Sequence, residues 1–166
     1  MKMIRNLLTD ILYGNRFTAI VRILIGLLFI YSGFFKAVDP AAFVKIVIKY
    51  GIIPEIMAPY AAIIFPFLEL VFGFLILIGF KIRASTSVLM LLMIFFIIII
   101  SINYIKGESF DCGCFELSRF GISEEIGIGV IIRDIIFLIM LAVLFNAERH
   151  FFSMENRIER DNLMGL

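Results

Sequence analysis

The chain is 166 residues long and 62% hydrophobic, with 17% charged residues, a mean hydropathy of +1.07 and a net charge of +1. A soluble domain typically carries about 25% charged residues, so this composition excludes a soluble globular enzyme and indicates a chain surrounded by lipid. The small net charge gives no basis for nucleic-acid binding through bulk electrostatics.

Four apolar stretches are long enough to cross a bilayer, whose hydrocarbon core of about 30 Å requires about 20 helical residues. They cover residues 17–38, 60–80, 84–105 and 126–146. Most of the charged residues lie between these stretches or beyond them. The sequence therefore predicts an all-α membrane protein, a bundle of four transmembrane helices that contacts the lipid bilayer.

A more polar segment, residues 39–59, joins the first two stretches and contains three prolines and a glycine. Three of its apolar residues recur near helical spacing: Phe43, Val47 and Tyr50. This spacing predicts a short helix. We expect it to lie at the membrane surface between the first two spans.

The distribution of lysine and arginine favours both termini in the cytoplasm of a bacterium. The first stretch carries no signal-peptide cleavage site, so we expect an uncleaved anchor in the inner membrane. This orientation places the loop 106–125 in the periplasm. We expect one transmembrane domain over residues 1–148 and a charged cytoplasmic tail over residues 149–166.

The only two cysteines of the chain, Cys112 and Cys114, lie in the sequence Asp-Cys-Gly-Cys-Phe of this loop. A disulfide across a single residue is strained, and strained, exposed disulfides exchange readily with the thiols of a partner. The periplasm also permits disulfide chemistry. We therefore predict that Cys112 and Cys114 are the catalytic pair of a thiol–disulfide exchange, with Lys36 or Lys106 available to offset the charge of Asp111.

Three other interpretations of the pair stay open. A structural disulfide is disfavoured, because so small a loop removes little entropy from the unfolded chain. A metal site would need more ligands, and His150, the sole histidine, is expected on the opposite side of the membrane. Two inert thiols in an apolar pocket are the third interpretation. We predict no metal.

Ionisable residues within the spans form a second candidate site, because charges at membrane depth are costly and usually pair inside the bundle. Three stripes at helical spacing contain them: Arg22, Gly26, Phe29, Gly33 and Lys36 in the first span, Pro66, Glu69, Gly73 and Ile76 in the second, and Gly129, Arg133, Ile136 and Met140 in the fourth. Small residues beside charges indicate close helix interfaces.

Depth in the membrane suggests a partner for Glu69. At about 1.5 Å per residue, Glu69 lies roughly 14 Å and Arg133 roughly 10 Å from the outer boundary, so we expect these two to form a buried pair. In one interpretation, the charges only fix helix packing. In the other, Lys36, Glu69 and Arg133 line a polar pocket that binds a quinone head group or carries protons. No covalent cofactor is predicted.

Together, these motifs resemble the MauE/DoxX family of four-helix membrane proteins over roughly residues 22–144. The matching elements are Gly-Leu-Leu-Phe-Ile-Tyr-Ser-Gly-Phe-Phe-Lys at 26–36, Asp39-Pro40, Pro66, Glu69, Gly73, Gly79 and Arg133-Asp134. The sequence Asp-Cys-Gly-Cys-Phe at 111–115 favours the MauE branch.

The resemblance implies a redox-associated protein that works with a periplasmic thioredoxin-like partner on the disulfides of exported proteins. DoxX-like relatives include a membrane subunit of a thiosulfate:quinone oxidoreductase. The layout also resembles quinone-coupled disulfide enzymes of the vitamin K epoxide reductase type. Those enzymes generally use two cysteine pairs, and because this chain has one, it has no internal relay.

We therefore expect a membrane thiol–disulfide redox component that exchanges electrons between a thioredoxin-like or exported thiol protein and quinone. It would act alone or within a larger membrane complex, and the sequence leaves its status as an enzyme open. The alternative is a non-catalytic scaffold or assembly subunit, which would tolerate Cys112→Ser or Cys114→Ser. A small transporter would instead depend on Glu69 and Arg133.

Overall fold

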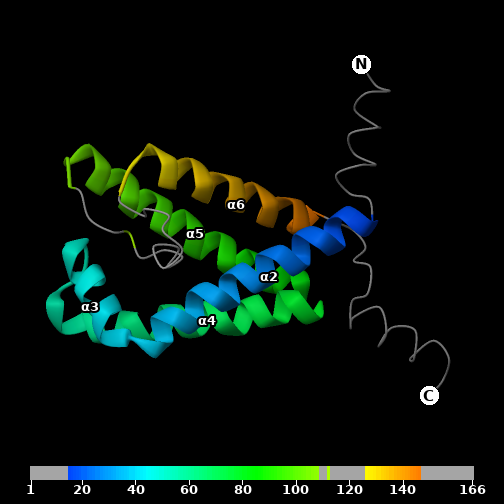
Figure 1. The fold of residues 1–166 in the computed structure, drawn as a ribbon, viewed down its shortest axis with the longest axis horizontal. Helices are drawn as coiled ribbons and strands as arrows, with labels where there is room; N and C mark the ends of the chain where they lie inside the picture. The colour runs from blue at the N-terminus through cyan, green and yellow to red at the C-terminus, as the bar shows by residue number, and fades with distance from the viewer. Residues whose placement is uncertain (1–14, 109–111, 113–125, 147–166) are drawn as a thin grey trace.

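The computed structural model describes residues 15–108, residue 112 and residues 126–146. The elements are α2 (Asn15–Val38), α3 (Pro40–Lys49), the 3₁₀ helix η1 (Glu55–Met57), α4 (Ala58–Ile78), α5 (Ile82–Ile105) and α6 (Ile128–Asn146). Figure 1 shows α3 at one end of the bundle, whereas α2 begins and α6 ends at the other. Cys114 and the predicted tail, residues 149–166, lie outside the described residues.

Within the described residues, α2, α4, α5 and α6 are each long and apolar enough to cross a membrane. The predicted four-helix fold and the short helix between the first two spans are confirmed. Helix α4 ends two residues before the predicted boundary because Gly79 adopts a left-handed conformation, with φ of 75°. Its N–H bonds to the carbonyl of Ile76, which closes the helix as a left-handed C-cap does.

Helices α2 and α4 pack closely through three glycines. A Cβ atom at Gly33 would lie 2.7 Å from the carbonyl oxygen of Pro66, and one at Gly26 would lie 3.1 Å from the carbonyl oxygen of Gly73. Only a hydrogen in place of the side chain permits backbones to approach so closely. The predicted inward stripes of these two helices are confirmed, since their members are buried.

Helix α3 is fixed at its start and along one face. A side-chain oxygen of Asp39 accepts a hydrogen bond of 3.0 Å from the backbone N–H of Ala42, which caps the helix. Phe43 and Val47 are buried in a cluster with Ala58 and Ala62 of α4, as their helical spacing predicts. The short helix is therefore attached to the start of α4.

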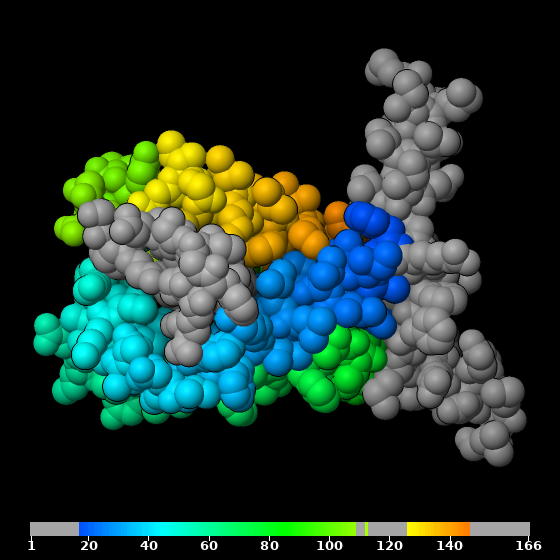
Figure 2. Space-filling view, in the orientation of Figure 1, coloured from blue at the N-terminus to red at the C-terminus, as the bar shows by residue number. Residues whose placement is uncertain are grey.

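Helix α6 faces the bundle with a different stripe from the predicted one. Its buried residues are Val130, Asp134, Leu141 and Leu144. The predicted inward stripe is wrong: Gly129 and Ile136 are exposed, and a Cβ atom at Gly129 would meet nothing within 4 Å. Helix α6 packs against α5 and, as Figure 2 also shows, against α2. Because it is apolar on all sides, its composition does not fix its rotation.

Candidate functional site

Lys36 of α2 and Glu69 of α4 form a buried ion pair. The Nζ atom of Lys36 donates to both carboxylate oxygens of Glu69, at 2.8 and 2.9 Å, and the hydroxyl of Ser32 donates to Oε2 at 3.0 Å. The two residues are only 1% and 3% exposed. Charges so far from solvent are tolerated when they are paired and hydrogen-bonded.

Aromatic rings surround the ammonium of Lys36. Its Nζ atom lies 5.3 Å from the ring centroid of Phe43 in α3 and 5.6 Å from that of Phe96 in α5. A cation within about 6 Å of a ring centroid is attracted by the electron-rich ring. The ammonium of Lys36 therefore contacts residues of α3, α4 and α5.

A second ion pair lies on α6, between neighbours in the chain. The guanidinium of Arg133 donates to Oδ1 of Asp134 through Nε at 3.0 Å and through Nη2 at 2.9 Å. Asp134 is buried, whereas the side chain of Arg133 is 20% exposed. Successive residues of a helix point about 100° apart. Asp134 thus points into the bundle while Arg133 extends along its side.

The predicted pair of Glu69 with Arg133 is wrong. Glu69 binds Lys36 and Ser32 across the α2–α4 contact, and Arg133 binds Asp134. Similar depth is not sufficient for contact, because α6 packs against α5 and α2 rather than against α4. The glycines that bring α2 against α4 place Lys36 opposite Glu69 instead.

Cys112 lies beside the pair of Arg133 and Asp134 and is buried. It is 1% exposed and belongs to the hydrophobic core cluster. Its Sγ atom lies 3.9 Å from Nη2 of Arg133, and its carbonyl oxygen accepts a hydrogen bond of 2.7 Å from the hydroxyl of Tyr50. Among the described residues, Arg133 is a cation beside this sulfur. Asp111, whose charge Lys36 or Lys106 is expected to offset, lies outside the described residues. Sequence reasoning missed this contact and that of Tyr50, since the residues that make them lie 21 and 62 positions apart in the sequence.

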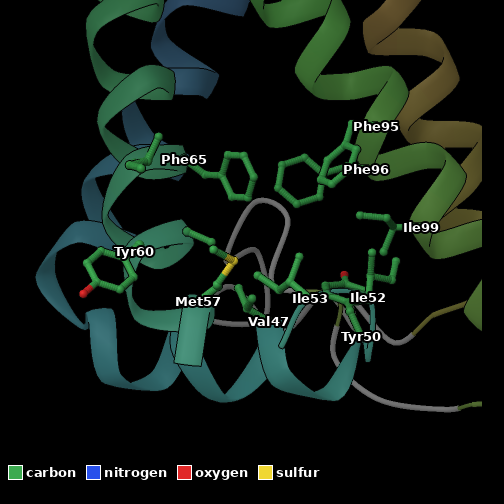
Figure 3. A pocket seen from close by; sticks show the side chains of 12 residues that line it. Val47, Tyr50, Ile52, Ile53, Met57, Tyr60, Phe65, Phe95, Phe96 and Ile99 are labelled. Carbon is green, nitrogen blue, oxygen red and sulfur yellow. The ribbon is translucent and has the colours of Figure 1, made fainter. Parts of the chain in front are cut away.

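An apolar cavity of about 320 Å³ lies between α3, η1, α4 and α5. Figure 3 shows the rings of Phe65 and Phe96 at one side of it and Tyr50 at another. None of the residues predicted to bind quinone, Lys36, Glu69 and Arg133, lines this cavity. Two residues that line the cavity nevertheless contact the polar groups described above. The ring of Phe96 contacts the ammonium of Lys36, and the hydroxyl of Tyr50 donates to the carbonyl of Cys112. Quinone binding stays a prediction.

Comparison with known proteins gives one family. The family described as methylamine utilisation protein MauE matches residues 14–147, which include every described helix and both cysteines. No curated protein and no solved structure matched the chain. The match spans most of the sequence and agrees with the resemblance given by the glycine, lysine and cysteine motifs. This multi-pass membrane protein therefore belongs to the MauE family.

Proposed function

We propose that the protein is a membrane thiol–disulfide redox component that uses Cys112 and Cys114 to pass electrons between a partner thiol protein and quinone. The observation that supports this most is the guanidinium of Arg133, 3.9 Å from the sulfur of Cys112. A cation beside a sulfur stabilises the thiolate, which is the reactive form of cysteine.

The proposed reaction has two halves. A partner dithiol reduces the Cys112–Cys114 disulfide, so that the partner becomes a disulfide and the pair a dithiol. The dithiol then gives two electrons and two protons to a quinone, which becomes a quinol, and the Cys112–Cys114 disulfide forms again. The description of the family links its members to methylamine utilisation. The proposed partner is therefore an exported protein of that process or a thioredoxin-like protein that serves it.

The apolar cavity supports a membrane quinone as the acceptor. Its walls are aliphatic and aromatic side chains, which suit a ring and an isoprenoid tail that move within the bilayer. Tyr50 lines the cavity and also holds the carbonyl of Cys112, so the cavity and the cysteine share a residue. The periplasmic position of the loop is part of the proposal, and the distribution of lysine and arginine supports it.

The test is the redox state of the two cysteines in cells. Rapid acid trapping followed by alkylation counts free thiols, and because the chain has no other cysteine, every added mass reports on this pair. We expect an oxidised pair in normal cells and a reduced pair after quinone depletion. A membrane-impermeant reagent applied after reduction tests whether the loop faces outward. Thiols that stay reduced regardless of the quinone pool would refute the proposal.

The burial of Cys112 and its bond to Tyr50 favour a second candidate, a scaffold whose cysteine packs a loop onto the bundle. A scaffold would keep the abundance of its partner normal when Cys112 or Cys114 is changed to Ser. The redox proposal instead expects either change to leave client proteins in the thiol form. Comparing client redox state with client abundance in the same cells separates the two.

A further inference from the structure

We infer that the apolar cavity is filled sideways from the lipid, through an opening between Tyr60 and Ile64 of α4 and Phe95 of α5. The ring of a membrane quinone enters the cavity there, while most of its isoprenoid tail stays in the lipid. The inference rests on the proposed function, which names quinone as the electron acceptor, and adds the route of entry and the residues that contact the ring. It is supported by the exposed rim of the cavity, its aromatic wall and its size.

The cavity is open on the side where α4 and α5 face the lipid. Tyr60 and Ile64, one turn apart in α4, are 67% and 53% exposed, and Phe95 of α5 is 40% exposed. All three also line the cavity. Residues that are exposed and line a cavity mark its rim. Since both helices are long and apolar enough to span a membrane, these exposed side chains contact lipid.

The opening lies at the depth of the acyl chains. Helix α4 begins and α5 ends at the same end of the bundle, beside α3 (Figure 1). At about 1.5 Å per residue, Ile64 lies about 9 Å along α4 from Ala58, and Phe95 lies about 15 Å along α5 from Ile105. Because the hydrocarbon core is about 30 Å thick, a quinone dissolved in the bilayer reaches this opening without crossing water.

Three phenylalanine rings form one wall of the cavity and favour a flat ligand. The ring centroid of Phe65 lies 5.9 Å from that of Phe95 and 5.6 Å from that of Phe96. Aromatic rings attract each other at such separations, so this wall joins α4 to α5. The ammonium of Lys36, 5.6 Å from the ring centroid of Phe96, adds a further attraction. A quinone ring can stack on this wall or meet it edge to face, which an acyl chain cannot do.

The size of the cavity limits how much of the quinone it holds. Its volume of about 320 Å³ is near the lower end of the range for small-molecule sites. This space suits a ring and the beginning of a tail, so the rest of a long isoprenoid tail must extend into the lipid. Figure 3 shows the aliphatic side chains of Val47 and Ile53 opposite the rings of Phe65 and Phe96. The quinone ring would lie between these two sides.

Tryptophan fluorescence tests the route of entry, because the chain contains no tryptophan and any that is introduced is the sole one. The variants Ile64→Trp and Phe95→Trp place it on either side of the opening. Ile135→Trp is the matched control, since Ile135 of α6 is 41% exposed and does not line the cavity. Each full-length variant is placed in lipid nanodiscs and titrated with decylubiquinone and, separately, with a short-tailed menaquinone, since quinones quench indole fluorescence on contact.

We expect quenching that saturates in Ile64→Trp and Phe95→Trp, because a quinone bound in the cavity contacts the rim. In Ile135→Trp, quenching should rise in proportion to the amount of quinone in the lipid, as chance collisions do. Quenching that follows the same proportional line in all three variants, with both quinones, would overturn the inference. If one of the two rim variants does not fold, the other decides the matter.

Lipids with brominated acyl chains distinguish a quinone from a bound acyl chain, because bromine also quenches indole fluorescence. We expect these lipids to quench Ile64→Trp and Ile135→Trp alike, since both positions face lipid. Stronger quenching at position 64 that added quinone does not relieve would show that the cavity holds an acyl chain, and the inference would then be wrong.

Filling the cavity tests whether the saturable quenching comes from inside it. Ala61 of α4 lines the cavity and is partly buried. In the Phe95→Trp background, Ala61→Phe should raise the amount of quinone needed for half-quenching at least about tenfold, because its ring occupies the space of the ligand. Ala142→Phe, at a partly buried position of α6, is the control and should leave this amount unchanged. An equal effect of the two substitutions would contradict binding within the cavity.

Failure of the inference and failure of the proposed function give different results, because the fluorescence titrations measure binding without any turnover. If the cysteines follow the quinone pool in cells but the rim variants show no saturable quenching, only the route of entry and the site in the cavity are wrong. If quinone saturates the rim variants but the cysteines never follow the quinone pool, the proposed function fails and the binding site stands.

Discussion

Changing Glu69 to Leu should destabilise the protein more than changing Glu69 and Lys36 together. In the native protein, Nζ of Lys36 has two carboxylate oxygens within 2.9 Å and is 1% exposed. Glu69→Leu leaves this cation enclosed without its counter-charge. Breaking a buried pair by removing one partner costs about 3–5 kcal/mol. That range corresponds to a loss of more than about 100-fold in the folding equilibrium, since about 1.4 kcal/mol is tenfold.

The double change, Lys36→Met with Glu69→Leu, removes both charges and keeps similar volumes. Replacing a buried pair by well-packed apolar residues is often neutral or stabilising by about 1–4 kcal/mol. We therefore expect the double variant to be at least as stable as the native protein in the same lipid mixture. Lys36→Met alone should be milder than Glu69→Leu, because the hydroxyl of Ser32 still donates to the carboxylate.

The assay is the free energy of unfolding in mixed micelles, from a titration with denaturing detergent followed by far-ultraviolet circular dichroism. Lys45→Met, at an exposed position of α3, is the control for loss of a lysine at the same end of the bundle. A double-mutant cycle gives the coupling energy of the pair. A coupling below about 1 kcal/mol, the value for an exposed ion pair, would refute the reasoning.

Three further predictions concern packing, the cysteine contact and a helix cap. Gly33→Ala should lower the free energy of unfolding by about 1–3 kcal/mol, because its Cβ would lie 2.7 Å from a backbone carbonyl oxygen of α4. The control is Gly129→Ala, where the Cβ meets nothing within 4 Å and the melting temperature should stay unchanged or rise. Equal losses of stability in the two variants would contradict this. Tyr50→Phe should cost about 0.5–1.5 kcal/mol and speed the alkylation of Cys112, measured by tandem mass spectrometry; an unchanged rate would show that the hydroxyl does not hold the loop. Asp39→Ala should cost about 1 kcal/mol and speed hydrogen exchange in the first turn of α3, while Asp39→Asn should preserve its protection.

The inward faces of α2 and α4 could be predicted because charges and glycines are rare in apolar helices. Where they recur at helical spacing, as Gly26, Gly33 and Lys36 do, they mark the side that must avoid lipid or approach another backbone. The same reasoning could have predicted the ion pair of Lys36 with Glu69. The glycines of both helices predicted a close contact, and Lys36 and Glu69 lie on the faces that make it.

Helix α6 shows why the remaining contacts could not be predicted. Arg133 and Asp134 are adjacent, so both cannot point into the bundle, and the surrounding Ile and Leu residues do not indicate which one does. The depth argument predicted how far Arg133 lies from the outer boundary of the membrane, but not which side of α6 its side chain faces. Its contact with Cys112 joins residues 21 positions apart across the loop, and no local pattern encodes such a contact.

The ion pair between α2 and α4 also bears on how the protein enters the membrane during synthesis. Glu69 lies near the middle of α4, and a charged side chain at the centre of an isolated span costs about 3 kcal/mol to insert. Its partners, Lys36 and Ser32, belong to a helix that leaves the ribosome earlier. The cost of inserting α4 is therefore lower beside α2, where Lys36 and Ser32 meet the carboxylate of Glu69, and residues 39–57 connect the two helices.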